Sequence, residues 1–274
     1  AASDAERRKA AANWMTNPAN PLFSRVIVNR IWHHHFGQGL VNKPSDFGTG
    51  GGRPSNPELL DWLAGWFQQN NYSLKSLHRL IVTSMTYRQS AVSRPDALGR
   101  DRDNRLLWRF APKRLEGEAV RDSLLQAAGM LNTQQSGPSY EDVKEIHFNA
   151  GRYYHLIEVK GPKFDRRTIY RFSPRGERDA ILDTFDCPDP SATTPTRAVT
   201  TTPLQALSLS NNVFVWRMAD GLANRVQKEA GEALLDQVRR SWQLSLGREP
   251  DEMERSQASA MIAKHGLASL CRAL

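Results

Sequence analysis

The chain has 274 residues, of which 39% are hydrophobic and 24% charged, with a mean hydropathy of −0.57. This composition is typical of a folded protein and excludes wholesale disorder, and no apolar run approaches the roughly 18 residues of a membrane span. Lys and Arg outnumber Asp and Glu by 37 to 29, which gives a net charge of +8. The first residues lack the apolar segment of a signal peptide. Two cysteines, Cys187 and Cys271, are too few for a disulfide-dense scaffold, and we expect them not to be bridged.

The first 130 residues read as helices, because helix start signals recur along them. We expect helices over residues 5–14 and 22–36, the second ended by Gly37. After a glycine-rich loop at 48–52, two further helices follow, and the next block has its clearest helix at 114–130. The residues expected to cap the N-termini of the first four helices are Ser3, Asn20, Ser55 and Ser73.

Helical periodicity is lost between residues 131 and 178. Residues 153–159 and 168–172 mix aromatic and branched side chains, which indicates short strands or extended arms. A short helix is expected at 179–185, and residues 187–201 form a loop by their content of Pro, Ser and Thr.

The C-terminal part returns to helix. Thr202 and Pro203 resemble a capped start, and the pattern runs to about residue 230 with a break at Asn211 and Asn212. Helices over 233–246 and 251–264 follow, and the apolar helix that begins at residue 267 stops abruptly, so we expect the native polypeptide to continue.

These elements predict a mainly α, multi-helical globular domain with a loop- and short-strand-containing insert in the middle. The parts expected are a helical N-terminal part (1–130), a basic insert rich in loops and strands (131–201) and the C-terminal helices (202–274). Together they are expected to form one compact unit.

Polar residues share one face of the helix at 22–36. Arg25, Asn29 and Trp32 lie at positions i, i+4 and i+7, and we expect all three to be largely buried. A buried asparagine or arginine must be hydrogen-bonded, so Arg25 and Asn29 either organise packing or present donors to a ligand.

A metal site, a cofactor site and a nucleophile are not expected. Three consecutive helical residues point about 100° apart, so His33, His34 and His35 cannot all reach one ion. There is no phosphate-binding loop or G-x-S-x-G elbow, and Cys187 lies in a setting that does not lower the pKa of its thiol.

Positive charge gathers in the middle of the chain. Residues 149–178 hold eight cationic side chains and three acidic ones. They form a site for an anionic partner, or else a solvated region whose arginines pair with acids elsewhere. We expect no nucleic acid, because no nucleic-acid-binding motif accompanies the charge.

The most site-like stretch is also in this region. Arginines at 166–171 precede an acidic, proline-flanked loop at 186–189 and the helix start at Thr202. We expect these segments to approach one another, with arginines paired to Asp186 and Asp189, as an internal network or as an anion-binding cleft. The candidate ligand-binding residues are Arg25, Asn29, Arg167, Tyr170, Arg171, Asp186, Asp189, Arg197 and Thr202.

Ordered motifs along nearly the whole chain resemble a planctomycete-type secreted domain family of unknown function. The matching segments are NPLFSRVIVNRIW (20–32), FGQGLV (36–41), PSNPELLDWL (54–63), TYRQS (86–90), NRLLWR (104–109), RDSLL (121–125), RTIY (167–170), FDCPD (185–189) and TTPLQAL (201–207).

This resemblance implies a module near the C-terminus of a periplasmic or secreted multidomain protein. A second uncharacterised domain, and often a cytochrome-c-like domain, precedes it in the same polypeptide. The resemblance brings no agreed activity and no agreed catalytic residues.

We therefore expect an accessory or binding module with an arginine-rich cleft for an anionic polysaccharide. One alternative is a polysaccharide hydrolase that uses Asp186 or Asp189 as acid or base, which would need two carboxyl groups converging in a groove, with Glu116 as a third candidate. The other alternative is a docking module for a cytochrome-like partner.

Overall fold

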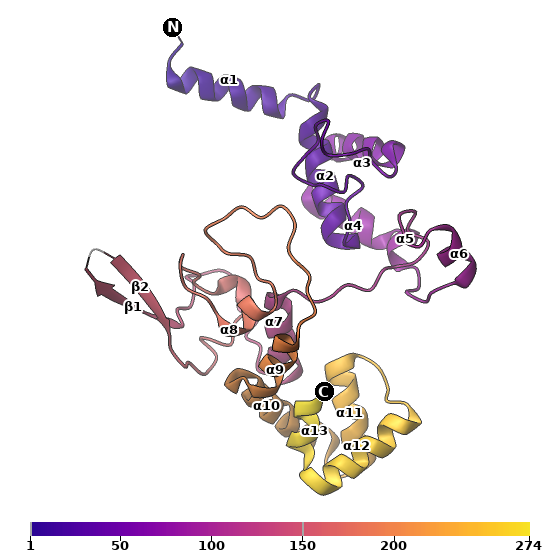
Figure 1. Cartoon of the computed structure of the whole chain (residues 1–274), viewed down its shortest axis with the longest axis vertical. Coiled ribbons are helices and arrows are strands. Elements are labelled where there is room, and N and C mark those ends of the chain that lie inside the picture. Colours follow the sequence, from indigo (N-terminus) through magenta and orange to yellow (C-terminus); the bar gives the residue numbers. More distant parts are fainter. Residues whose placement is uncertain (1, 150) are drawn as a thin grey trace. The chain divides into compact units, whose positions relative to one another are not determined.

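The computed structural model describes residues 2–149 and 151–274, and it is mainly helical, as predicted (Figure 1). The chain separates into two compact units, residues 1–114 and 115–274. The expected division at residues 130 and 201 remains a prediction.

The helices of the first unit begin where the capping residues predict. Asn20 accepts a hydrogen bond from the Leu22 amide and Pro21 takes the first helical position, while Gly37 ends the helix in the left-handed conformation with φ 82°. The third helix differs slightly from the prediction, because Asn56 rather than Ser55 caps it. The helices are α1 (Asp4–Thr16), α2 (Pro21–Phe36), α3 (Pro57–Gln69), α4 (Leu74–Thr83), α5 (Met85–Arg88) and α6 (Pro95–Arg100).

The core of this unit lies where α2 packs against α3 and α4. Helix α1 contributes no buried residue to it. Burial of these apolar faces, rather than helix propensity, is the main source of stability for such short helices. The most deeply buried apolar side chains are those of Val28, Leu60, Leu63, Phe67, Leu77 and Ile81.

The second unit is organised around α10, which packs against α7, α9, α11 and α13. A Cβ at Gly221 of α10 would lie 2.9 Å from Met130 Sδ, so the glycine permits the close approach of the segment after α7. The helices of this unit are α7 (Gly117–Ala127), α8 (Ala180–Thr184), α9 (Pro203–Asn211), α10 (Val213–Ala230), α11 (Leu234–Leu246), α12 (Glu252–His265) and α13 (Leu267–Ala273).

The strands of the middle form one antiparallel hairpin, β1 (Val143–Phe148) with β2 (Gly151–Leu156), in which Val143 pairs with Leu156. The expectation of a strand or extended arm at 168–172 is wrong in part, because Thr168–Tyr170 is a 3₁₀ turn, η1. The amide and hydroxyl of Thr168 bond to the Asp122 carboxylate, and this contact from α7 fixes the turn.

Among the described residues, no helix is both long enough and apolar enough to cross a membrane.

Candidate functional site

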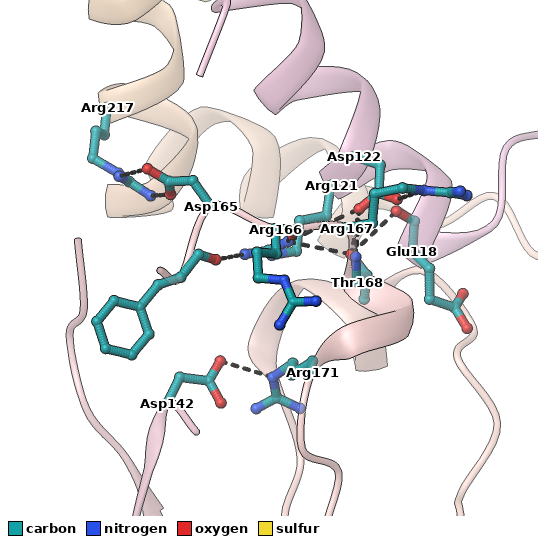
Figure 2. Close-up of polar contacts among 11 residues, drawn as sticks. Glu118, Arg121, Asp122, Asp142, Asp165, Arg166, Arg167, Thr168, Arg171 and Arg217 are labelled. Atoms are coloured by element: carbon teal, nitrogen blue, oxygen red, sulfur yellow. Dashed lines mark hydrogen bonds and ion pairs between the residues drawn. The ribbon is translucent and has the colours of Figure 1, made fainter. Parts of the chain in front are cut away.

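Several arginines of the middle segment form a buried hydrogen-bonded network with carboxylates and backbone carbonyls (Figure 2). Arg171 lies at its centre and is only 7% exposed. Its Nε donates to Asp142 Oδ2 at 2.8 Å, and its two Nη atoms donate to the Glu177 carboxylate at 3.2 and 3.1 Å. Burial by itself lowers the pKa of Arg171, but the hydrogen bonds to Asp142 and Glu177 outweigh it and raise that pKa above its ordinary value.

Two further buried arginines hold loop carbonyls. Arg121 donates to the carbonyls of Phe164 and Arg166, both at 2.9 Å. Arg166 donates to the carbonyls of Pro138 and Ser136 at 2.9 and 2.6 Å. Backbone acceptors in a segment without regular structure need donors when buried, and these guanidinium groups supply them.

A fourth arginine, Arg217 on α10, belongs to the network. Its Nη2 and Nη1 donate to Asp165 Oδ1 and Oδ2 at 2.7 and 3.1 Å, a bidentate ion pair that Figure 2 shows. Asp165 is 2% exposed. The bidentate geometry makes this one of the stronger types of ion pair, and it fixes the segment ahead of η1 to α10.

Arg167 is the exposed member of the group. Its side chain is 60% exposed, and its Nε lies 3.4 Å from Asp122 Oδ2. Tyr170, also a candidate, accepts the Ser136 amide on its hydroxyl at 3.0 Å and places its ring 4.2 Å from the Arg166 guanidinium. Among the candidate arginines of this segment, Arg167 alone presents most of its charge to solvent.

The expected pairing of these arginines with Asp186 and Asp189 is wrong. Asp186 accepts from the amide and hydroxyl of Thr200, and Asp189 accepts from the Ser191 amide at 2.7 Å. The arginines instead take acids that lie closer in space, such as Glu177.

One of the expected approaches is present, that of the 186–189 loop to the helix start at Thr202. The Thr200 hydroxyl that Asp186 holds also accepts from Gln205 Nε2, and Gln205 forms the capping box of α9 with Thr202. Asp186 therefore reaches the start of α9. Asp189 and Arg171 line one small cavity of about 110 Å³.

Arg197 binds two acids at the start of α7, Glu118 at 2.7 Å and Glu116 at 3.0 Å. Burial favours a higher pKa for Glu118, but the Arg197 hydrogen bond and its other contacts lower the pKa below the ordinary value. Cys187 Sγ lies 3.6 Å from Glu118 Oε1, and burial together with that carboxylate raises the pKa of Cys187 to about 11. This thiol is therefore not activated as a nucleophile.

Both cysteines are free thiols in the structure, with Cys187 half-buried and Cys271 buried.

Arg25 and Asn29 belong to the other unit. Asn29 is fully buried, as predicted, and its side-chain amide donates to the Val41 carbonyl at 3.0 Å and accepts the Val41 amide at 2.8 Å. Asn29 therefore fixes the backbone of the loop after α2. The expectation that Arg25 is buried is wrong, since its side chain is 36% exposed and pairs at the surface with Asp61 of α3 at 2.5 Å.

The histidines form a small ring cluster. His35 Nε2 and His78 Nδ1 are 2.8 Å apart, and burial, then the neighbouring His78, lowers the pKa of His35. Within residues 2–149 and 151–274, no group of three or more His, Cys, Asp or Glu side chains is arranged to hold a metal ion.

Several network residues were not among the sequence candidates: Arg121, Asp122, Asp142, Asp165, Glu177 and Arg217. The available signal was the presence of Asp165 and Glu177 inside the basic stretch itself. Arg121 and Arg217 are on helices far away in sequence, and nothing in the local pattern marks them.

Comparisons with curated proteins and with solved structures find no match. A family model described as "PSD1: Protein of unknown function (DUF1553)" matches residues 7–262. Because that match spans most of the chain, the chain belongs to this DUF1553 family of proteins of unknown function.

Proposed function

We propose that the chain is a non-catalytic binding module for an acidic polymer, specifically an anionic glycan outside the cytoplasm, and that residues 1–114 make the contact. The observation that carries this proposal is the division of charge between the two units. Residues 1–114 hold 17 Lys and Arg against eight Asp and Glu, while residues 115–274 hold 20 against 21. The basic excess of the chain thus belongs to the first unit, while in the second unit buried arginines such as Arg171 and Arg217 are paired with acids of the same unit.

The excess is densest in residues 88–114, which we call the arginine-rich segment. It contains seven Arg and one Lys against three Asp. A high local density of one charge sign raises the local concentration of an oppositely charged polymer and accelerates association.

The best-placed acid of this segment is committed to the backbone. Both carboxylate oxygens of Asp101 accept backbone amides, from Arg105 at 3.0 Å and Leu106 at 2.8 Å. The ion pairs Arg8–Asp4 and Arg25–Asp61 of the first unit lie outside the segment. We take the exposed guanidinium groups of Arg100, Arg102 and Arg105 as the ones that meet sulfate or carboxylate groups of a ligand.

The aromatic residues of the segment favour a polymer without bases. Trp108 is half-buried, with the guanidinium groups of Arg94 and Arg109 5.7 and 5.0 Å from its ring, and its Nε1 donates to the Asp101 carbonyl. Single-stranded nucleic acids are bound by open aromatic faces on which bases stack, and Trp108 does not offer one.

The hydrolase alternative gains no support from the contacts. Asp186, Asp189 and Glu116 are engaged separately, by Thr200, Ser191 and Arg197. Hydrogen bonds from Ser191 lower the pKa of Asp189, whereas a general acid needs a raised pKa.

The test is binding of the full chain to immobilised dextran sulfate, with uncharged dextran and single-stranded DNA as comparisons. The variant replaces Arg100, Arg102 and Arg105 together by alanine. Its matched control replaces three exposed cations of the second unit, Lys163, Arg175 and Lys264, and removes the same total charge.

We expect dextran sulfate affinity to fall about tenfold or more in the first triple variant and to change little in the second. Added salt should weaken binding, since the charges are exposed. Equal losses in the two variants would show that net charge alone is responsible, and tighter binding of the DNA would replace the glycan by nucleic acid; either result overturns the proposal.

A further inference from the structure

A second feature belongs to the second unit, residues 115–274. A cavity of about 260 Å³ is formed by the segment that follows β2, the start of α8 and the start of α10. Its apolar lining includes Ile157, Phe164, Val213 and Phe214. This volume is below the roughly 300–1,000 Å³ of pockets for drug-sized ligands, so the space suits one small ring.

The charges around this cavity are already balanced by protein partners. The cationic and the acidic lining residues are equal in number: Arg121, Lys160 and Arg217, and Asp142, Glu158 and Asp179. Lys160 pairs with Glu158 at 2.8 Å, and Arg217 pairs with Asp165 behind the wall. A ligand with a net charge would have to break one of these pairs, so the lining favours a neutral molecule.

Two buried polar groups in this region lack hydrogen-bond partners among the described residues. Asp142 is 9% exposed, and its Oδ2 is taken by Arg171, but its Oδ1 has no hydrogen-bond partner among the described residues. The hydroxyl of Tyr140, which is 2% exposed, is likewise without a partner in the described part of the chain. Unpaired buried polar atoms are rare and costly.

Of these two residues, Asp142 belongs to the cavity lining, whereas Tyr140 does not. The Tyr140 ring lies behind that lining, edge-on to Phe164 at 6.3 Å between ring centres. The wall thus combines a carboxylate oxygen that lacks a hydrogen-bond donor with the apolar side chains around it.

We propose that this cavity binds a neutral, hydroxyl-rich ring, such as one sugar unit, with a ligand hydroxyl donating to Asp142 and the ring seated against Phe164 and Ile157. Hydroxyl groups supply the donor that the carboxylate lacks without adding charge, and apolar ring faces suit aromatic walls. The inference does not depend on the proposed function, because it concerns different residues and a ligand of different charge.

The test uses saturation-transfer NMR on the full chain with glucose, galactose, mannose and xylose. Glucuronate and leucine serve as charged and zwitterionic comparisons. The blocking variant is Val213→Trp, at a 58% exposed position that lines the cavity, so the larger side chain can be accommodated without disturbing the core. The control is Leu207→Trp, at a 56% exposed position of α9 that is not part of the cavity lining.

We expect at least one neutral sugar to bind, with affinity reduced about tenfold by Val213→Trp and unchanged by Leu207→Trp. Asp142→Asn, which exchanges an acceptor oxygen for a donor, should also weaken binding. The proposal is overturned if none of the four sugars binds, if Val213→Trp leaves binding intact, or if glucuronate or leucine binds as well as the sugars. Dextran sulfate binding should be the same in Val213→Trp as in the unmodified chain, which separates this result from that of the first unit.

Discussion

Replacing Asn29 by leucine should destabilise residues 1–114 by about 2–5 kcal/mol. The side chain is fully buried on α2, and both of its hydrogen bonds go to the backbone of Val41. Leucine is similar in size but can neither donate nor accept, so the Val41 amide and carbonyl would remain buried without partners. Each such group costs about 1–3 kcal/mol, and the added apolar burial offsets part of the sum.

The same helix offers a control with the opposite expectation. Ser24 is 1% exposed, and its hydroxyl has no hydrogen-bond partner among the described residues. Ser24→Ala removes a buried polar atom without stranding another, so we expect no loss of stability and a gain of up to about 1 kcal/mol.

The assay must follow the first unit alone, because two compact units need not unfold in a single transition. Urea-dependent hydrogen exchange, read by mass spectrometry on peptides from α2, reports the free energy of opening for this unit. An unchanged opening free energy in Asn29→Leu, or an equal loss in Ser24→Ala, would refute the reasoning that paired backbone groups are what Asn29 supplies.

Three further predictions follow from ion pairs and thiols. Glu177→Gln leaves the buried Arg171 charge partly unpaired and should cost about 3 kcal/mol, whereas Asp183→Asn, at an exposed pair, should cost about 0.5 kcal/mol or less; urea unfolding of the second unit compares them. The Arg248 hydrogen bond is the largest cause that lowers the pKa of Glu254, to about 2, so this carboxylate stabilises the fold above its unfolded pKa near 4.5 and loses that effect as the pH falls toward 2. NMR titration should show that pKa returning toward 4.5 in Arg248→Ala, and an unmoved value would contradict the assignment. Cys187, with its pKa near 11, should react with iodoacetamide at pH 8 far more slowly than in urea; equal rates would contradict its placement.

The helices could be predicted because their start and stop signals are local. Asn20 with Pro21, Thr202 with Gln205 and the Asp251 capping box each act within four residues, and the structure forms all three. Such signals need no knowledge of the tertiary fold.

The network could not be predicted, because its partners are set by how the loop folds. A charge count recognises that arginines at 166–171 need acceptors, but it cannot choose between Asp186 and Glu177, or foresee that Arg166 uses carbonyl oxygens instead of acids. The turn at 168–170 depends likewise on Asp122, 46 residues earlier in the sequence. In a segment without periodicity, no sequence pattern encodes these distances.

Arginine serves opposite purposes in the two units, and the number of available acceptors decides which. In residues 115–274, cations and acids are nearly equal in number, and Arg121, Arg166 and Arg171 are buried with every terminal nitrogen close to a carbonyl or carboxylate. There the planar guanidinium replaces the hydrogen bonds that a sheet would otherwise supply to a long irregular segment. In residues 88–114 the acids are too few, and Asp101 is committed to backbone amides. Charge that the fold itself does not neutralise is the charge that remains for a partner, and for this reason we propose that the recognition surface lies in the unit with the weaker acid supply.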